Sequence, residues 1–223
     1  MSDIDKSVYR GGTGEVIEKK SRFIATVAAV STKEEAEEFI ASCKKKYWDA
    51  RHNCSAYIIA GAVDILHSSD DGEPSGTAGK PMLEVLTKEG IRNVCVVVTR
   101  YFGGTLLGTG GLVRAYQAAV KEGIKNCILL EKQAGIKAEI ITDYNDAGKL
   151  QHFFASNRVV VLHSEYGQNV VMEILIPLEK KNSVEEKIVD ITCGKTGLES
   201  VEEVFYAPVE GEVKIWRTEL KKD

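Results

Sequence analysis

Two glycine-rich runs carry the residue types that could perform chemistry. They span residues 70–82 and 99–116, and both combine glycine with charged and hydroxyl side chains. Glycine is placed where the backbone turns sharply or closely approaches a neighbour or a ligand. A purely structural loop rarely needs both features, so the sequence predicts that function is concentrated in these two runs.

Anion binding is the chemistry that best suits the second run. Gly108–Gly111 opens a predicted helix directly after a loop. Unpaired backbone N–H groups at a helix N-terminus bind anions, and small residues let the ligand approach. An equally weighted alternative is a tight loop packed against a neighbouring strand. The predicted anion or nucleic-acid contacts are Lys80, Arg100, Tyr101, Gly103, Gly104, Gly108, Thr109, Gly110, Gly111 and Arg114.

Neither run matches a known nucleotide-binding motif. The phosphate-binding loop of nucleoside triphosphatases needs glycine where this chain has Pro74, and serine or threonine where it has Pro81. The dinucleotide fingerprint would need glycine at Val113. The sequence therefore favours a looser backbone-amide site over either motif.

A second group of polar residues consists of three carboxylates in the first run and His52, which precedes it. Asp70, Asp71 and Glu73 could bind magnesium or act as acid and base, but carboxylates on a turn are more often solvated or paired with Lys80 or an arginine. A Cys-His nucleophile pair would need contact between side chains two positions apart on a strand. For His52, a partly buried structural role is favoured. No metal or cofactor is expected.

Aromatic side chains flank the arginines of the second run. They are Tyr101, Phe102 and Tyr116. Aromatic rings beside arginine suit stacking on single-stranded bases. They equally suit the edge of a hydrophobic core, and the sequence leaves both interpretations open.

Composition limits the classes of partner. The net charge is −4, whereas nucleic-acid-binding domains are usually strongly basic. Residues 1–133 carry 18 Lys and Arg against 17 Asp and Glu, and residues 134–223 carry 11 against 16. Only a local basic patch in the first half could contact a phosphate backbone. No apolar run approaches the ~18 residues of a membrane-spanning helix, and the scattered cysteines are typical of buried thiols, so a cytoplasmic protein is expected.

Hydrophobic spacing predicts an α+β fold with two domains, 1–133 and 134–223. The second has the order βαββαβ, which is the ferredoxin-like pattern. Elements expected in the first domain are strands 21–30, 54–60, 62–67 and 94–99 and helices 31–47, 81–90 and 112–127, with a capping box at Ser31 and Glu34 and Pro81 opening its helix. Elements expected in the second are strands 136–141, 159–165, 170–176 and 201–206, a helix capped by Asp143, a helix capped by Ser183 and Glu186, and a tail at 214–223 that is a short strand or disordered.

Three longer motifs resemble the IMPACT/YigZ family. They are Asp49–Cys54, residues 69–82 and residues 100–116. The resemblance implies a first domain like domain IV of elongation factor G and the second domain of a ribosomal protein, and a ferredoxin-like second domain. Eukaryotic relatives in this family regulate translation by binding a ribosome-associated activator of a stress kinase. The resemblance does not imply that this chain binds the same partner.

These observations favour a non-enzymatic cytoplasmic factor that associates with RNA or the ribosome. Its contact surface would be the glycine-rich loops with Arg100 and Arg114. The alternative is an enzyme or ligand-binding protein that acts on a phosphorylated small molecule through the same loops. A third possibility, a protein-binding module, would instead present an exposed apolar patch.

Overall fold

The computed structural model describes residues 5–217, and these divide into two compact units. One unit holds residues 5–131, and the other begins at Lys132. The strand β8 (Ile128–Thr142) runs through the division. Each unit is described by itself below, and the boundary of independently folding domains expected at residues 133 and 134 stays a prediction.

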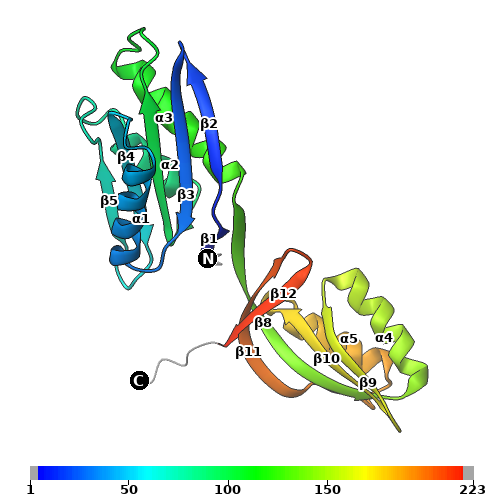
Figure 1. The fold of residues 1–223 in the computed structure, drawn as a ribbon. Coiled ribbons are helices and arrows are strands. Elements are labelled where there is room, and N and C mark those ends of the chain that lie inside the picture. The colour runs from blue at the N-terminus through cyan, green and yellow to red at the C-terminus, as the bar shows by residue number, and fades with distance from the viewer. Residues whose placement is uncertain (1–4, 218–223) are drawn as a thin grey trace. The chain divides into compact units, whose positions relative to one another are not determined.

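The 5–131 unit is built on a five-stranded antiparallel sheet with the order β2-β3-β7-β4-β5 (Figure 1). A separate strand, β1, pairs in parallel with β6. The elements are β1 (Asp5–Arg10), β2 (Thr13–Glu18), β3 (Ser21–Ala29), α1 (Lys33–Lys46), β4 (His52–Ile59), β5 (Ile65–Ser69), α2 (Gly79–Lys88), β6 (Ile91–Arg92), β7 (Val94–Tyr101) and α3 (Thr109–Lys125).

Helices cover both faces of this sheet. Helices α2 and α3 pack on one face, against Ala56, Val96 and Val98 among others. Helix α1 packs on the other face, against Tyr57 and Cys95. The central strand β7 is therefore buried on both sides, which explains its run of apolar, β-branched residues and confirms the prediction of a fully buried strand.

Strand register brings the ends of three strands together beside the second glycine-rich run. In the sheet, Arg100 of β7 lies opposite Phe23 of β3 on one side and His52 of β4 on the other. The second run leaves the sheet directly after Tyr101, where β7 ends. The candidate site is built around this end of β7.

The unit that begins at Lys132 has a second antiparallel sheet, with the order β9-β10-β8-β11-β12. Helices α4 and α5 share one hydrophobic core with β8 and β10. The predicted hairpin and the Asp143 cap, whose carboxylate accepts the Asp146 N–H at 2.9 Å, are confirmed. Its further elements are α4 (Tyr144–Asn157), β9 (Val160–Tyr166), β10 (Val170–Pro177), the 3-10 turn η1 (Leu178–Lys180), α5 (Lys181–Ile191), β11 (Glu199–Val209) and β12 (Glu212–Arg217).

Both predicted capping boxes are wrong. Thr32, not Ser31, caps α1: its hydroxyl accepts the Glu35 N–H at 3.2 Å, and the Glu35 carboxylate accepts the Ser31 N–H at 2.6 Å. In α5, Ser183 lies inside the helix and donates to the Lys180 carbonyl at 3.0 Å, because a 3-10 turn leads into the helix before this serine is reached.

Several expected boundaries also move. Strand β8 begins at Ile128 rather than at 136, and α3 begins at Thr109 rather than at 112. Pro81 is the third residue of α2 rather than the first, which is tolerated because the first four N–H groups of a helix have no partner within it. Residues 214–217 of the tail belong to β12, and the rest of the predicted tail lies outside the described residues.

The cysteines differ in exposure. Cys43, Cys54 and Cys95 are buried as predicted, and Cys127 is half-buried. Cys193 is exposed, which corrects the expectation of buried thiols for this residue. Across the described residues, none of the helices combines the length and the apolar character that a membrane crossing requires.

Candidate functional site

A buried ion pair joins the two glycine-rich runs. Arg100 Nη1 donates to Glu73 Oε1 at 2.7 Å, and the two side chains are only 8% and 2% exposed. Glu73 thus takes the arginine pairing that was one of its expected roles. The charge of Arg100 is balanced inside the protein, so this residue is not the free cation that the anion-site prediction assumed.

Tyr116 and Cys54 extend this network into the core. Tyr116 donates to the same Glu73 oxygen at 2.8 Å, and its ring packs edge-on against Phe23 with the ring centres 5.2 Å apart. Cys54 Sγ lies 3.3 Å from Tyr116 Oη and 2.9 Å from the Asp70 carbonyl oxygen. Burial raises the pKa of Cys54 to about 12, so its thiol stays protonated at neutral pH and serves packing rather than nucleophilic attack.

Asp70 organises the first run. Its two carboxylate oxygens accept the backbone N–H groups of Gly76 at 2.8 Å, Ala78 at 3.0 Å and Gly79 at 2.8 Å. Two of these donors lie at the beginning of α2, where N–H groups lack partners within the helix. Burial alone would raise the pKa of Asp70, but the three N–H donors outweigh it and lower the pKa.

This arrangement makes Asp70 a pH-dependent source of stability. We expect Asp70→Asn to lower the free energy of unfolding at pH 7 by about 1–3 kcal/mol, because the amide accepts fewer of these bonds. Since the folded-state pKa is lowered, the wild-type advantage is full above about pH 4 and shrinks as the pH falls further. Urea denaturation of both proteins at pH 7 and at lower pH measures the difference. A difference that does not change with pH would contradict this role.

Asp71 and His52, the other two polar residues of this group, also make hydrogen bonds to neighbouring residues. Asp71 accepts the Asn53 N–H at 2.7 Å and the Lys44 ammonium at 2.6 Å. His52 Nδ1 lies 3.0 Å from the Asp71 carbonyl oxygen. Within residues 5–217, no group of three or more His, Cys, Asp or Glu side chains is placed to hold a metal ion.

The glycines of the two runs serve two different purposes. A Cβ atom on Gly79 would lie 2.6 Å from the Ser69 nitrogen, and one on Gly103 would lie 2.1 Å from the Lys20 carbonyl carbon. Only glycine fits at these two positions, because backbone atoms of another segment occupy the place of a Cβ atom. A Cβ on Gly104, Gly108 or Gly110 would meet nothing within 4 Å. The structural alternative therefore suits the first pair. Gly104 and Gly108 have φ values of 85° and 72°, a backbone conformation that favours glycine, so of these five glycines Gly110 is the one without a structural requirement.

The beginning of α3 is accessible. Gly108 is the N-cap of α3, with a φ of 72°, and no side chain accepts a hydrogen bond from the first N–H groups of the helix at this cap. Thr109 and Gly110 are exposed. Gly111 is partly covered, since its Cβ position lies 3.0 Å from Leu107 Cβ. The side chains of Lys80 in α2 and Arg114 in α3 are exposed, and no ion pair to either is found among residues 5–217.

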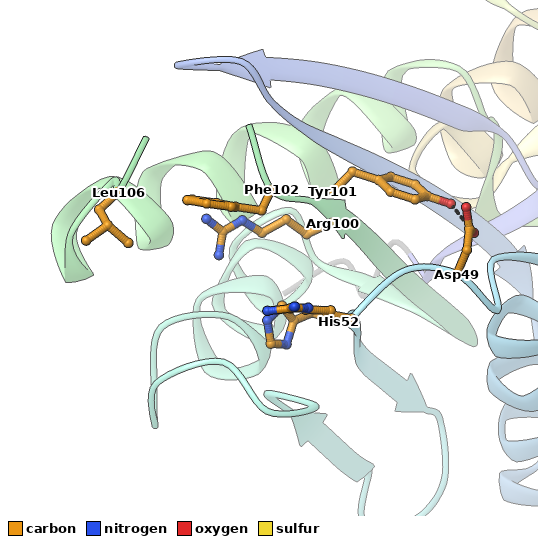
Figure 2. Close-up of a pocket in the computed structure, with 7 residues that line it drawn as sticks. Asp49, His52, Arg100, Tyr101, Phe102 and Leu106 are labelled. Atoms are coloured by element: carbon orange, nitrogen blue, oxygen red, sulfur yellow. Dashed lines mark hydrogen bonds between the residues drawn. The ribbon is translucent and has the colours of Figure 1, made fainter. Parts of the chain in front are cut away.

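A pocket of about 380 Å³ opens at the end of β7. Figure 2 shows Phe102 beside the Arg100 guanidinium, with His52 on the other side of that group. The Arg100 guanidinium carbon lies 5.8 Å from the centre of the Phe102 ring. Tyr101 donates to Asp49 Oδ1 at 2.7 Å. The lining residues are Asp49, Arg51, His52, Arg100, Tyr101, Phe102 and Leu106.

Sequence reasoning about sites missed three of these residues. Asp49 and Arg51 drew attention only as part of the Asp49–Cys54 motif, and Leu106 only as part of the second run. Their place in the pocket depends on β4 and β7 lying side by side, which brings His52 opposite Arg100. The motif itself was the one available signal for Asp49 and Arg51.

Comparison with known proteins identifies the family. A model of the Impact N-terminal domain matches residues 19–124, and a model of a domain of unknown function, DUF1949, matches residues 140–195. The IMPACT family member YvyE of Bacillus subtilis is 39% identical over 208 residues, which cover 93% of this chain and 96% of that protein. This chain belongs to the IMPACT family. The family member YigZ of Escherichia coli is 36% identical over 83% of this chain and 92% of its own length.

A solved structure is similar to this chain over most of its length. A crystal structure titled as a hypothetical protein is 32% identical, covers 91% of this chain and 98% of that one, and superposes with a TM-score of 0.56. The family resemblance of the three motifs and the α+β class are therefore confirmed. A structure titled as the two-domain translational regulator Yih1 matches 53% of this chain with a TM-score of 0.39, which carries no argument about the fold.

Proposed function

We propose that this IMPACT-family protein is a non-enzymatic, cytoplasmic factor that associates with RNA or the ribosome in translation or its regulation. The observation that carries the proposal is the surface at the end of β7, where the exposed ring of Phe102 lies beside Arg100 in a pocket that Arg51 also lines. Aromatic rings next to arginine suit unpaired bases. Family membership supports the link to translational regulation, which the resemblance implies for eukaryotic relatives.

Exposed cations in the same unit could take the phosphates. Lys80 lies near the beginning of α2 and Arg114 in the first turns of α3, whose N-terminal N–H groups are accessible. Phosphate contacts supply most of the affinity of such complexes, and they make it depend on salt. Lys80, Arg114 and the open glycines of α3 are the phosphate contacts in this proposal.

The proposed fold relationships fit a translation factor. We infer a ferredoxin-like second domain, because the elements β8 to β11 follow the order βαββαβ and lie in the sheet as β11-β8-β10-β9. We likewise infer that the first domain resembles domain IV of elongation factor G. These relationships are analogies between folds and add context rather than chemistry.

An enzyme or ligand-binding protein for a phosphorylated small molecule is the second candidate. The pocket volume of about 380 Å³ favours it, since ligand sites typically measure about 300–1,000 Å³. Against catalysis, Asp70, Asp71 and Glu73 are each engaged in hydrogen bonds that hold the loop, and the Cys54 thiol is buried.

Salt-dependent RNA binding tests the leading proposal. We expect fluorescence anisotropy with labelled single-stranded RNA and with purified ribosomes to give binding at low ionic strength that weakens linearly on a log–log plot against salt. Lys80→Ala with Arg114→Ala should reduce the slope by about 1.4, near 0.7 for each lost phosphate contact. Lys187→Ala, an exposed lysine of α5, is the matched control and should leave the slope unchanged.

Absence of binding at low salt would overturn the RNA proposal. A thermal-shift screen with sugar phosphates and nucleotides then tests the second candidate, because a ligand at 100 times its dissociation constant stabilises the folded state by about 2.7 kcal/mol.

A further inference from the structure

The turn between β2 and β3 has an unfavourable backbone conformation for its residues. The two strands pair up to Glu18 and Ser21. Lys19 and Lys20 therefore form the whole turn, and their φ values are 44° and 67°. Left-handed backbone at both positions is the type I′ geometry, which favours asparagine followed by glycine. Lysine is disfavoured at both positions, because its Cβ atom crowds the backbone there.

A second hairpin of this chain reaches the same geometry with glycine. The turn between β11 and β12 consists of Glu210 and Gly211, whose φ values are 52° and 88°. Among residues 5–217, Lys19 and Lys20 are the one consecutive pair of non-glycine residues with positive φ. Strained backbone clusters at functional sites, so this turn points to a role for the two lysine side chains.

The turn contacts the second glycine-rich run. The Gly103 N–H donates to Ser21 Oγ at 3.1 Å, and a Cβ atom on Gly103 would lie 2.1 Å from the Lys20 carbonyl carbon. Figure 1 shows the tip of the β2–β3 hairpin at the same end of the sheet as the beginning of α3. The turn therefore lies at the end of the 5–131 unit where α3 presents its N-terminal N–H groups.

The hairpin tip is positively charged. Lys19 and Lys20 are exposed, and no ion pair to either is found among residues 5–217. The neighbouring Arg22 is paired with Glu15, since its Nε lies 2.7 Å from Glu15 Oε1. The two lysines therefore outnumber Glu18, the carboxylate that precedes them in the sequence. Ammonium groups of this kind bind phosphate as point charges.

We propose that the β2–β3 turn contacts the phosphate backbone of RNA through Lys19 and Lys20. The inference rests on the proposed association with RNA, and it adds the hairpin tip to the contacts assigned to α2 and α3. Phosphate contacts position a nucleic acid and carry no sequence information, so the turn supplies affinity without base preference. Asparagine and glycine would relieve the strain, but they would remove both charges.

A double variant separates stability from binding. Lys19→Asn with Lys20→Gly installs the favoured turn sequence, so the melting temperature should rise while RNA binding weakens. Fluorescence anisotropy with labelled single-stranded RNA should give a log–log salt slope smaller by about 1.4, near 0.7 for each lost phosphate contact. Lys19→Arg with Lys20→Arg keeps both charges and should keep the wild-type slope. Lys187→Ala with Lys195→Ala removes two exposed lysines outside the 5–131 unit and should also leave the slope unchanged.

The outcomes distinguish this inference from the proposal on which it rests. No RNA binding at low salt would overturn both. Salt-dependent binding with an unchanged slope in Lys19→Asn with Lys20→Gly would overturn the role of the turn and leave RNA association intact. A lower melting temperature of this variant would overturn the argument from strain and the inference with it. Free phosphate is a second probe: if it displaces RNA at a concentration equal to that of the RNA phosphates, the site serves small anions and the RNA assignment is wrong.

Discussion

Replacing Glu73 by alanine is expected to lower the free energy of unfolding of the 5–131 unit by about 3–5 kcal/mol. The substitution leaves the Arg100 guanidinium buried without a counter-charge, and it also removes the acceptor of the Tyr116 hydroxyl. An uncompensated charge in the interior is among the most destabilising changes a fold can suffer. Urea denaturation followed by circular dichroism measures the loss.

Two further variants show whether burial is the cause. Glu15→Ala breaks an exposed ion pair in which Arg22 Nε lies 2.7 Å from Glu15 Oε1, and its effect should stay within about 1 kcal/mol. Combining Glu73→Leu and Arg100→Met with Tyr116→Phe replaces the buried pair and the hydroxyl that depends on it by apolar groups, and it should restore most of the stability. If Glu73→Ala destabilises the protein no more than Glu15→Ala, the account of the buried pair is wrong.

Gly103→Ala is expected to destabilise the same unit by about 1–3 kcal/mol or more. A methyl group there would lie 2.1 Å from the Lys20 carbonyl carbon, so the turn between β2 and β3 or the start of the second run must shift. Because Phe102 precedes this glycine directly, the shift should also weaken RNA binding. Thermal unfolding and anisotropy titrations measure the two effects.

Gly110→Ala is the matched control, since no atom lies within 4 Å of the added methyl group. Alanine inside a helix stabilises relative to glycine by up to about 1 kcal/mol, so the melting temperature should stay the same or rise. If Gly110→Ala lowers the melting temperature as much as Gly103→Ala does, close packing against Lys20 is not the cause of the Gly103→Ala effect.

The elements that the sequence predicted well are those defined by local pattern. Strand β7 was predictable because an unbroken run of β-branched residues is typical of burial on both faces. The N-cap of α1 was misplaced by one residue for a local reason: Ser31 and Thr32 are both good caps, and Glu34 and Glu35 both follow at the spacing of a capping box. Only the backbone conformation decides between them.

The parts of the site that the sequence did not predict depend on contacts between distant segments. Glu73 was considered for acid–base chemistry, yet it is the partner of Arg100 and Tyr116, which follow it by 27 and 43 positions. The contact of Asp49 with Tyr101 likewise appears only when the segment between α1 and β4 lies beside the end of β7. These contacts join segments that are far apart in the sequence, and no local pattern encodes them.

The uneven exposure of the five thiols makes the chain suitable for selective labelling. Burial raises the pKa of Cys54 and Cys95 to about 12, whereas Cys193 is open to solvent and lies outside the 5–131 unit. A maleimide dye should therefore attach first to Cys193. Slower reaction of the buried thiols Cys43, Cys54 and Cys95 would then report when the core of the 5–131 unit opens, so the protein carries a built-in probe of its own unfolding.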